Sequence, residues 1–175
     1  MRRSKGFNLV EVMVALIIIS VGLLGIAKMQ ALAMSSTGAA KMKSLASLEA
    51  ASLASSIRAD REYWSNVTVL TTVVFDDGVV TSSTDGALMS GASCEVAGAC
   101  PVITDMVSYN LQKWGADLAT QMPKHKATLA CAQGSITVPV TCTVVLKWAE
   151  NRVAVNQQST GETALANQYT LYVEP

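Results

Sequence analysis

The sequence predicts an α+β protein in which one long N-terminal helix packs on a small antiparallel sheet, with an inserted second helix. Three observations support this prediction. A long run of helix-compatible residues begins near the N-terminus and contains no proline. A second stretch repeats apolar residues at spacings of three and four. The other apolar segments are short, and several are rich in Val and Thr.

The first helix begins with an apolar run at residues 9–27, whose single charged residue is Glu11. A helix of about 20 apolar residues crosses a bilayer, so this run is long enough to span a membrane. Arg2, Arg3 and Lys5 precede it, which predicts a cytoplasmic N-terminus. An ordinary signal peptide or signal anchor is the alternative. A signal peptide has a shorter apolar core and a small-x-small cleavage site, whereas this run continues into more helix-compatible sequence.

Beyond the membrane segment, the helix is expected to continue to about Arg61. Residues 35–38 form a weak point, where the helix could bend or loosen. One face should pack on the globular domain, although Glu49 interrupts it. That face comprises Met42, Ala46, Leu53 and Ile57.

The segment after this helix alternates between strand and turn signals. Residues 66–75 are rich in Val and Thr and predict a strand or an extended segment. Asp76, Asp77 and Gly78 predict a turn. Residues 79–98 are small and polar, which predicts a surface loop that could include one short strand.

The second helix is bounded by Pro101, which precedes it, and Pro123, which follows it. Its apolar stripe is Ile103, Val107, Leu111, Trp114, Leu118 and Met122. Such a stripe is far more often core than ligand site, so Trp114 is assigned to the core.

The remaining strands are predicted at residues 126–131, 140–148, 152–155 and 168–173. Gly134 and Ser135 suggest a tight turn, which would pair Cys142 with Lys126. Pairing Cys142 with Cys131 instead requires a wider loop or a bulge. Pro139 favours the wider loop, because proline cannot donate to a central ladder.

Four cysteines all follow the membrane segment. Because that part of the chain should face an oxidising space, two disulfides are more consistent with the pattern than four free thiols. Four cysteines allow three pairings. Sequence proximity favours Cys94 with Cys100, and Cys131 with Cys142 would then join two neighbouring strands. A zinc site is not expected, since the spacings are wide and His125 is the single histidine.

No catalytic set stands out, so the sequence predicts neither an enzyme nor a bound cofactor. His125 lies between two lysines and is predicted to be exposed. Acids that could bind a cation are Asp76, Asp77 and Asp105, and turn acids rarely do so. Lys113, Lys124 and Lys126 are interpreted as a solvated face. The net charge is zero and no long basic run follows the leader, which argues against nonspecific nucleic-acid binding.

The sequence changes from a short basic leader to apolar residues between Gly6 and Phe7. Residues 6–11 read GFNLVE, which resembles the class III signal of type IV prepilins, whose pattern is close to GFTLIE. Asn8 replaces the common Thr, while the glycine, the aromatic residue and the acid are retained. The resemblance implies that a dedicated peptidase cleaves after Gly6 and that Phe7 becomes N-methylated.

Glu11 is costly in lipid, at roughly 2.5–3.5 kcal/mol on insertion scales, so a function is expected for it. The resemblance implies that Glu11 meets the free amine of a neighbouring subunit's Phe7 in a fibre core. Removing one partner of a buried pair costs about 3–5 kcal/mol, so this pair would set the register of assembly. The alternative is a Glu11 that lies at the headgroup level and costs little.

Further similarity, to the PilV group of minor pilins, covers most of the chain. It is carried by residues 14–16, 20–25, Gln30, 50–61 and the later Cys and Trp positions. It implies a type IV pilin-like fold, with a leader at residues 1–6, a membrane and fibre-core helix at 7–29, its amphipathic continuation at 30–61 and a head at 62–175.

The same resemblance implies a minor pilin that enters or primes a type IV pilus near the fibre tip and supports adhesion and twitching motility. Its partners would be prepilin peptidase, the inner-membrane assembly platform, other minor pilins, the major pilin and a tip adhesin. It would cross the bacterial inner membrane once before it enters the extracellular pilus. A type II secretion pseudopilin shares this N-terminus and is the alternative; a DNA-uptake minor pilin is the third candidate.

Overall fold

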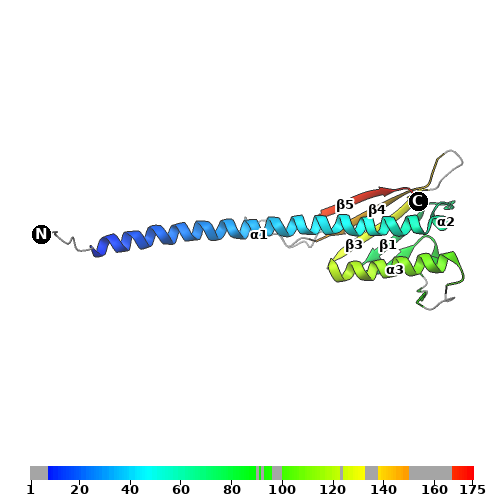
Figure 1. Cartoon of the computed structure of the whole chain (residues 1–175), viewed down its shortest axis with the longest axis horizontal. Coiled ribbons are helices and arrows are strands. Elements are labelled where there is room, and N and C mark those ends of the chain that lie inside the picture. The colour runs from blue at the N-terminus through cyan, green and yellow to red at the C-terminus, as the bar shows by residue number, and fades with distance from the viewer. Residues whose placement is uncertain are drawn as a thin grey trace. The chain divides into compact units, whose positions relative to one another are not determined.

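The computed structural model describes residues 8–89, 91, 93–95, 100–122, 124–132, 138–149 and 167–175. Its elements make an α+β fold, in which a long N-terminal helix and a second helix accompany an antiparallel sheet (Figure 1). This confirms the predicted fold class. The chain divides into two compact units, Met1–Ala40 and Lys41–Pro175. Helix α1 (Leu9–Ala59, 51 residues) contributes to both, and it is unbroken through residues 35–38.

The second unit contains a five-stranded sheet in the order β2-β1-β3-β4-β5, and every neighbouring pair is antiparallel. The strands are β1 (Thr71–Asp76), β2 (Val79–Ser83), β3 (His125–Ala132), β4 (Thr141–Trp148) and β5 (Asn167–Val173). Alternate residues of β1, β3 and β4 are buried, as expected for strands with one face on a core. The face predicted from Val140 to Trp148 is buried throughout.

Two helices supply the other side of the core. The second half of α1 buries Ala46, Ala50, Leu53, Ala54 and Ile57, and α3 (Ile103–Gln121) buries Val107, Leu111, Trp114 and Leu118. Trp114 Nε1 donates to the Glu49 carbonyl at 3.1 Å, which joins α3 to α1. The Trp114 ring also meets Phe75 of β1 edge to face, with centroids 5.1 Å apart. Trp114 is therefore a core residue, as its place in the apolar stripe predicts.

The predicted loop at residues 79–98 contains more structure than expected. It holds strand β2 and a short 3-10 helix, η1 (Gly86–Met89), whose Leu88 is fully buried. The segment predicted as a strand or extended chain at residues 66–75 forms a strand only from Thr71 onwards. Helix α1 ends at Ala59, slightly before the predicted end, and the short α2 (Arg61–Trp64) follows it. The predicted turn at 134–135 and strand at 152–155 lie outside the described residues, as does Pro123.

The prediction that His125 is exposed is wrong, because the side chain is 1% exposed. His125 begins β3, and strand alternation puts it on the same buried face as Ala127 and Leu129. Its Nδ1 lies within hydrogen-bonding distance of the Met122 carbonyl, which can only accept, so Nδ1 carries the proton. Its backbone N–H donates to Asp77 Oδ1 at 3.3 Å.

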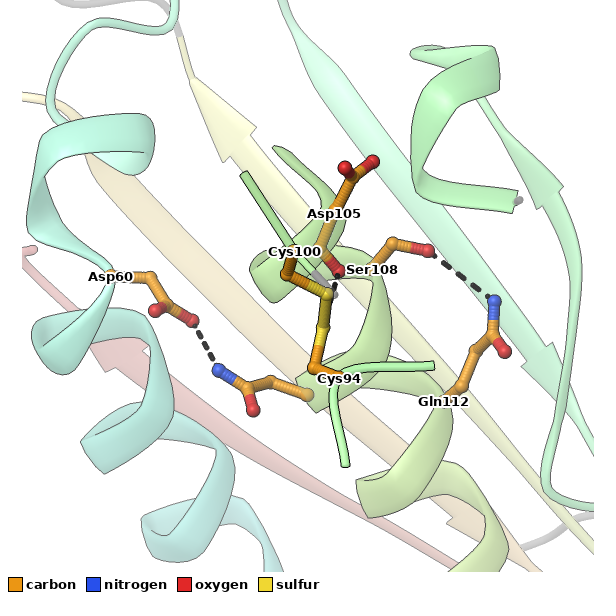
Figure 2. The surroundings of a disulfide bond; sticks show 7 residues. Asp60, Cys94, Cys100, Asp105, Ser108 and Gln112 are labelled. Atoms are coloured by element: carbon orange, nitrogen blue, oxygen red, sulfur yellow. Dashed lines mark hydrogen bonds between the residues drawn. A yellow bond between two sulfur atoms is a disulfide. The ribbon is translucent and has the colours of Figure 1, made fainter. Parts of the chain in front are cut away.

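Both disulfides lie in the second unit. Cys131 and Cys142 are direct partners in the β3–β4 ladder and are bonded to each other, so the connection between these strands is the wider loop. Cys94 and Cys100 form the second bond beside the start of α3, where Cys94 Sγ lies 3.7 Å from the Asp105 carbonyl (Figure 2). These are the pairs that sequence proximity favours.

Candidate assembly segment

The first half of α1 exposes an unusually long apolar surface. No described residue of the first unit is buried, and large apolar side chains from Leu9 to Met34 are exposed. Soluble proteins rarely expose an apolar surface of this extent, so this segment requires lipid or protein around it. Among the described residues, α1 is the single helix that is long and apolar enough to cross a membrane.

Asn8 begins this helix as its N-cap. The Asn8 carbonyl accepts from the N–H groups of Glu11, at 3.0 Å, and Val12, at 3.4 Å. Its side-chain Oδ1 accepts from the Val10 N–H at 3.4 Å. Asn is among the best N-cap residues because its oxygen satisfies an N–H that the helix leaves open. The preference of Asn for N-caps is the sequence signal that indicates this role for Asn8.

Glu11 lies in the first turn of α1, and its side chain is exposed. The N-terminal end of a helix carries partial positive charge, which stabilises a nearby carboxylate by about 0.3–1 kcal/mol. That gain is smaller than the roughly 2.5–3.5 kcal/mol cost of placing a carboxylate in the bilayer centre. The helix end alone therefore does not offset the cost of an ionised Glu11 in an apolar environment.

Two hydroxyl groups in this segment donate to carbonyls of their own helix. Ser20 Oγ donates to the Leu16 carbonyl at 2.6 Å, and Thr37 Oγ1 donates to the Ala33 carbonyl at 2.9 Å. Hydrogen bonds of this kind satisfy a hydroxyl donor when a helix is surrounded by hydrocarbon. These residues are thus compatible with a membrane or a dry fibre core.

Residues 1–27 match a family model described as the prokaryotic N-terminal methylation motif. This chain carries that motif. The matched range contains Gly6 and Phe7, which lie outside the described residues, and Glu11, which the structure describes. Searches of curated proteins and of solved structures gave no significant match.

The motif supports a type IV pilin-like or pseudopilin protein. A long apolar N-terminal helix followed by a small antiparallel sheet also matches the type IV pilin-like architecture. Methylation-motif proteins of this kind are processed by a prepilin peptidase, so the match implies processing and assembly with other pilins. The membrane-length helix is consistent with anchoring before assembly.

Other polar residues of the second unit fall into two places: Asp76, Asp77, His125 and Lys126 lie together at one end of β1 and β3, and Asp105 and Lys113 lie on α3. Asp76 pairs with Lys126 at 3.0 Å across β1 and β3, and Lys113 lies over the Tyr109 ring at 5.9 Å. Within the described ranges, no group of three or more His, Cys, Asp or Glu side chains could hold a metal ion. Asp105 lies in the first turn of α3, near the Cys94–Cys100 bond (Figure 2).

Sequence reasoning missed a polar pair in the second unit. Tyr63 Oη donates to Asp85 Oδ2 at 2.6 Å. Burial of the phenol, followed by this hydrogen bond, raises the pKa of Tyr63 above its ordinary value. The partners are far apart in the sequence and come from α2 and the residue before η1, so no local pattern could have indicated the contact.

Proposed function

We propose that this protein is a minor pilin of a type IV pilus. The observation that supports this proposal best is Glu11, a carboxylate in the first turn of an exposed apolar helix within the matched methylation motif. Prepilin peptidase cleaves after Gly6, and Phe7 becomes the methylated N-terminal residue. Residues 7–29 then leave the bilayer for the fibre core, residues 30–61 continue the helix, and residues 62–175 form the head.

The proposed role of Glu11 is to register the incoming subunit. Its carboxylate pairs with the N-terminal amine of a neighbouring subunit's Phe7. In a core with little water, a subunit at the wrong axial position leaves both charges without a partner, at a cost of about 3–5 kcal/mol. The pair therefore selects one position along the fibre, and its contribution is structural rather than catalytic.

The proposed orientation follows from charge and redox chemistry. Arg2, Arg3 and Lys5 keep the N-terminus in the cytoplasm, so the protein crosses the inner membrane once. The second unit, which holds both disulfides, then faces the periplasm, an oxidising compartment. After assembly this unit is part of the extracellular pilus.

The proposed partners are prepilin peptidase, the inner-membrane assembly platform, other minor pilins, the major pilin and a tip adhesin. The similarity to the PilV group supports a place near the fibre tip, where the protein would prime assembly and support adhesion and twitching motility. The motif itself is shared with pseudopilins of type II secretion systems, which remain the second candidate.

Deletion of the gene tests the pilus against the pseudopilus. A minor pilin predicts reduced surface piliation and reduced twitching with normal secretion of exoproteins. Loss of exoprotein secretion with normal twitching would instead assign the chain to a secretion pseudopilus. Complementation with the intact gene must restore the affected process in either case.

A further inference from the structure

A groove of about 550 Å³ opens on the second unit, between α2, the segment that leads into β1, and the first residue of α3. Its lining includes Glu62, Tyr63, Val67, Val69, Asp85 and Ile103. The two disulfides and the predicted assembly residue Glu11 are not among its lining residues. It is therefore a feature that the proposed registration of the N-terminal helix does not use.

The charged residues that line the groove are both acidic. Glu62 is exposed, and Asp85 is partly buried. The Asp85 carboxylate is held in place from both sides, because Oδ2 accepts from Tyr63 Oη at 2.6 Å and Oδ1 accepts from the Ala87 N–H at 3.0 Å. A carboxylate that is already oriented binds a cation with little further loss of freedom.

Exposed apolar side chains share the groove lining with these carboxylates, and others are close to them in sequence. Val69 and Ile103 line the groove and are 59% and 37% exposed. Their sequence neighbours Leu70 and Val102 are 59% and 54% exposed, and Met106, one turn along α3, is 40% exposed. A groove that combines exposed apolar side chains with a few charged groups is typical of a protein contact surface.

We propose that this groove receives a segment of a different, neighbouring subunit, which presents a lysine or arginine beside apolar side chains. The cationic head group would meet Glu62 and Asp85, while its aliphatic stem would pack on Val69 and Ile103. This inference rests on the proposed function, since only assembly brings another subunit to the second unit.

Charge complementarity selects this occupant over the alternatives. An anionic partner, including a nucleic acid, would meet two carboxylates of like charge. A second copy docked groove to groove would bring its own Glu62 and Asp85 against the same pair. A cationic segment of another subunit avoids both conflicts and covers the apolar rim.

Site-specific photo-crosslinking in piliated cells tests the proposal on the full-length chain. A photoreactive amino acid replaces Thr84, which lines the groove, and in a control replaces Thr170, an exposed residue of β5. We expect the Thr84 position to yield a product with another pilin subunit, whose crosslinked peptide contains Lys or Arg. A Thr84 yield no higher than that at Thr170, a lipid adduct or a product of two copies of this chain would overturn the proposal.

Charge variants give an independent test. Glu62→Lys should reduce the Thr84 crosslink about tenfold, because it puts a cation against a cation. Glu174→Lys makes the same charge change at an exposed residue outside the groove lining and should leave the yield unchanged. Equal yields for the two variants would contradict the inference.

The two proposals can fail separately. The N-terminal mass and the presence of the unmodified chain in sheared pili are measured in the same cells. A chain that is neither cleaved nor assembled contradicts the proposed function. A chain that is cleaved and assembled, with Glu62→Lys and wild type giving the same crosslinks, contradicts the groove proposal alone.

Discussion

Gly78 and Gly115 meet backbone to backbone where the turn between β1 and β2 packs on α3. A Cβ at Gly115 would lie 2.5 Å from the Gly78 carbonyl oxygen, and a Cβ at Gly78 would lie 2.7 Å from the Gly115 carbonyl oxygen. Gly78 also has a φ of +87°, a conformation that favours glycine. The contact sets how closely the β1–β2 turn approaches α3. Neither residue can carry a side chain without movement of the backbone.

Gly115→Ala should therefore destabilise the protein by about 1–3 kcal/mol, the usual cost of overpacking a core. For a chain of this size, that corresponds to a fall in Tm of about 2–4 °C per kcal/mol. Thermal unfolding of the full chain in detergent, followed by circular dichroism, measures the change. Gly86→Ala is the matched control, because a Cβ there meets nothing within 4 Å. Equal Tm values for the two variants would show that the contact is not tight.

Removal of the Cys131–Cys142 disulfide should cost about 2–4 kcal/mol, the typical contribution of a disulfide. Both cysteines are fully buried in central strands, so Cys131→Ala with Cys142→Ala also loses core packing. Cys94→Ala with Cys100→Ala should cost less, because Cys94 is only partly buried and the bond closes a shorter loop, with a sequence separation of 6 against 11. Thermal unfolding of the two double variants shows which loses more stability. A larger loss for the Cys94–Cys100 variant would refute the assignment of Cys131–Cys142 to the core.

Tyr63 should make stability sensitive to alkaline pH. Its pKa is raised in the folded protein, so folding favours the protonated phenol. This contribution is fully present below the unfolded tyrosine pKa of about 10 and is lost as the pH rises further. Unfolding by urea at pH 8 and at increasing alkaline pH should show a steeper loss of stability for the wild type than for Tyr63→Phe. Parallel profiles would mean that the Tyr63–Asp85 hydrogen bond is not stabilising.

Much of the fold could be predicted because periodicity reports burial directly. The alternating face of β4 buries the residues that its spacing indicates, and so does the stripe of α3 except at Ile103, its first residue, which is exposed. The burial of His125 could also have been predicted, because period-two alternation places it on one face with Ala127, Leu129 and Cys131. The lysines on either side of it instead indicated a solvated segment. Spacing is therefore a better guide to burial here than the polarity of sequence neighbours.

Other features depend on contacts that are distant in sequence. Helix α1 ends before Asp60, whose carboxylate accepts from Asn110 Nδ2 of α3 at 2.9 Å; Figure 2 labels Asp60 and marks this bond with a dashed line. Strand β2 has only five residues and forms an edge of the sheet, and the small polar residues that follow its two valines hide its length in the sequence. The groove is likewise lined by residues from α2, from the segment just before η1 and from the start of α3, so no single motif encodes it.

Glu11→Ala should give a protein that is cleaved and stable in the membrane but is absent from pili. The variant keeps Gly6 and Phe7 for processing and loses only the charge that registers the subunit. Ser20→Ala is the matched control in the same segment, because the Ser20 hydroxyl bonds only within its own helix at the Leu16 carbonyl. Immunoblots of membranes and sheared pili report both steps. Normal recovery of Glu11→Ala from pili would eliminate the registration role.

The N-terminal mass of the mature protein, measured by mass spectrometry on piliated cells, tests the central claim most directly. The proposal predicts a chain that begins at Phe7, lacks residues 1–6 and carries one added methyl group. Replacement of Gly6 should leave the leader attached and keep the protein out of the fibre. An intact leader on the wild-type chain in cells that make working pili would contradict the proposal.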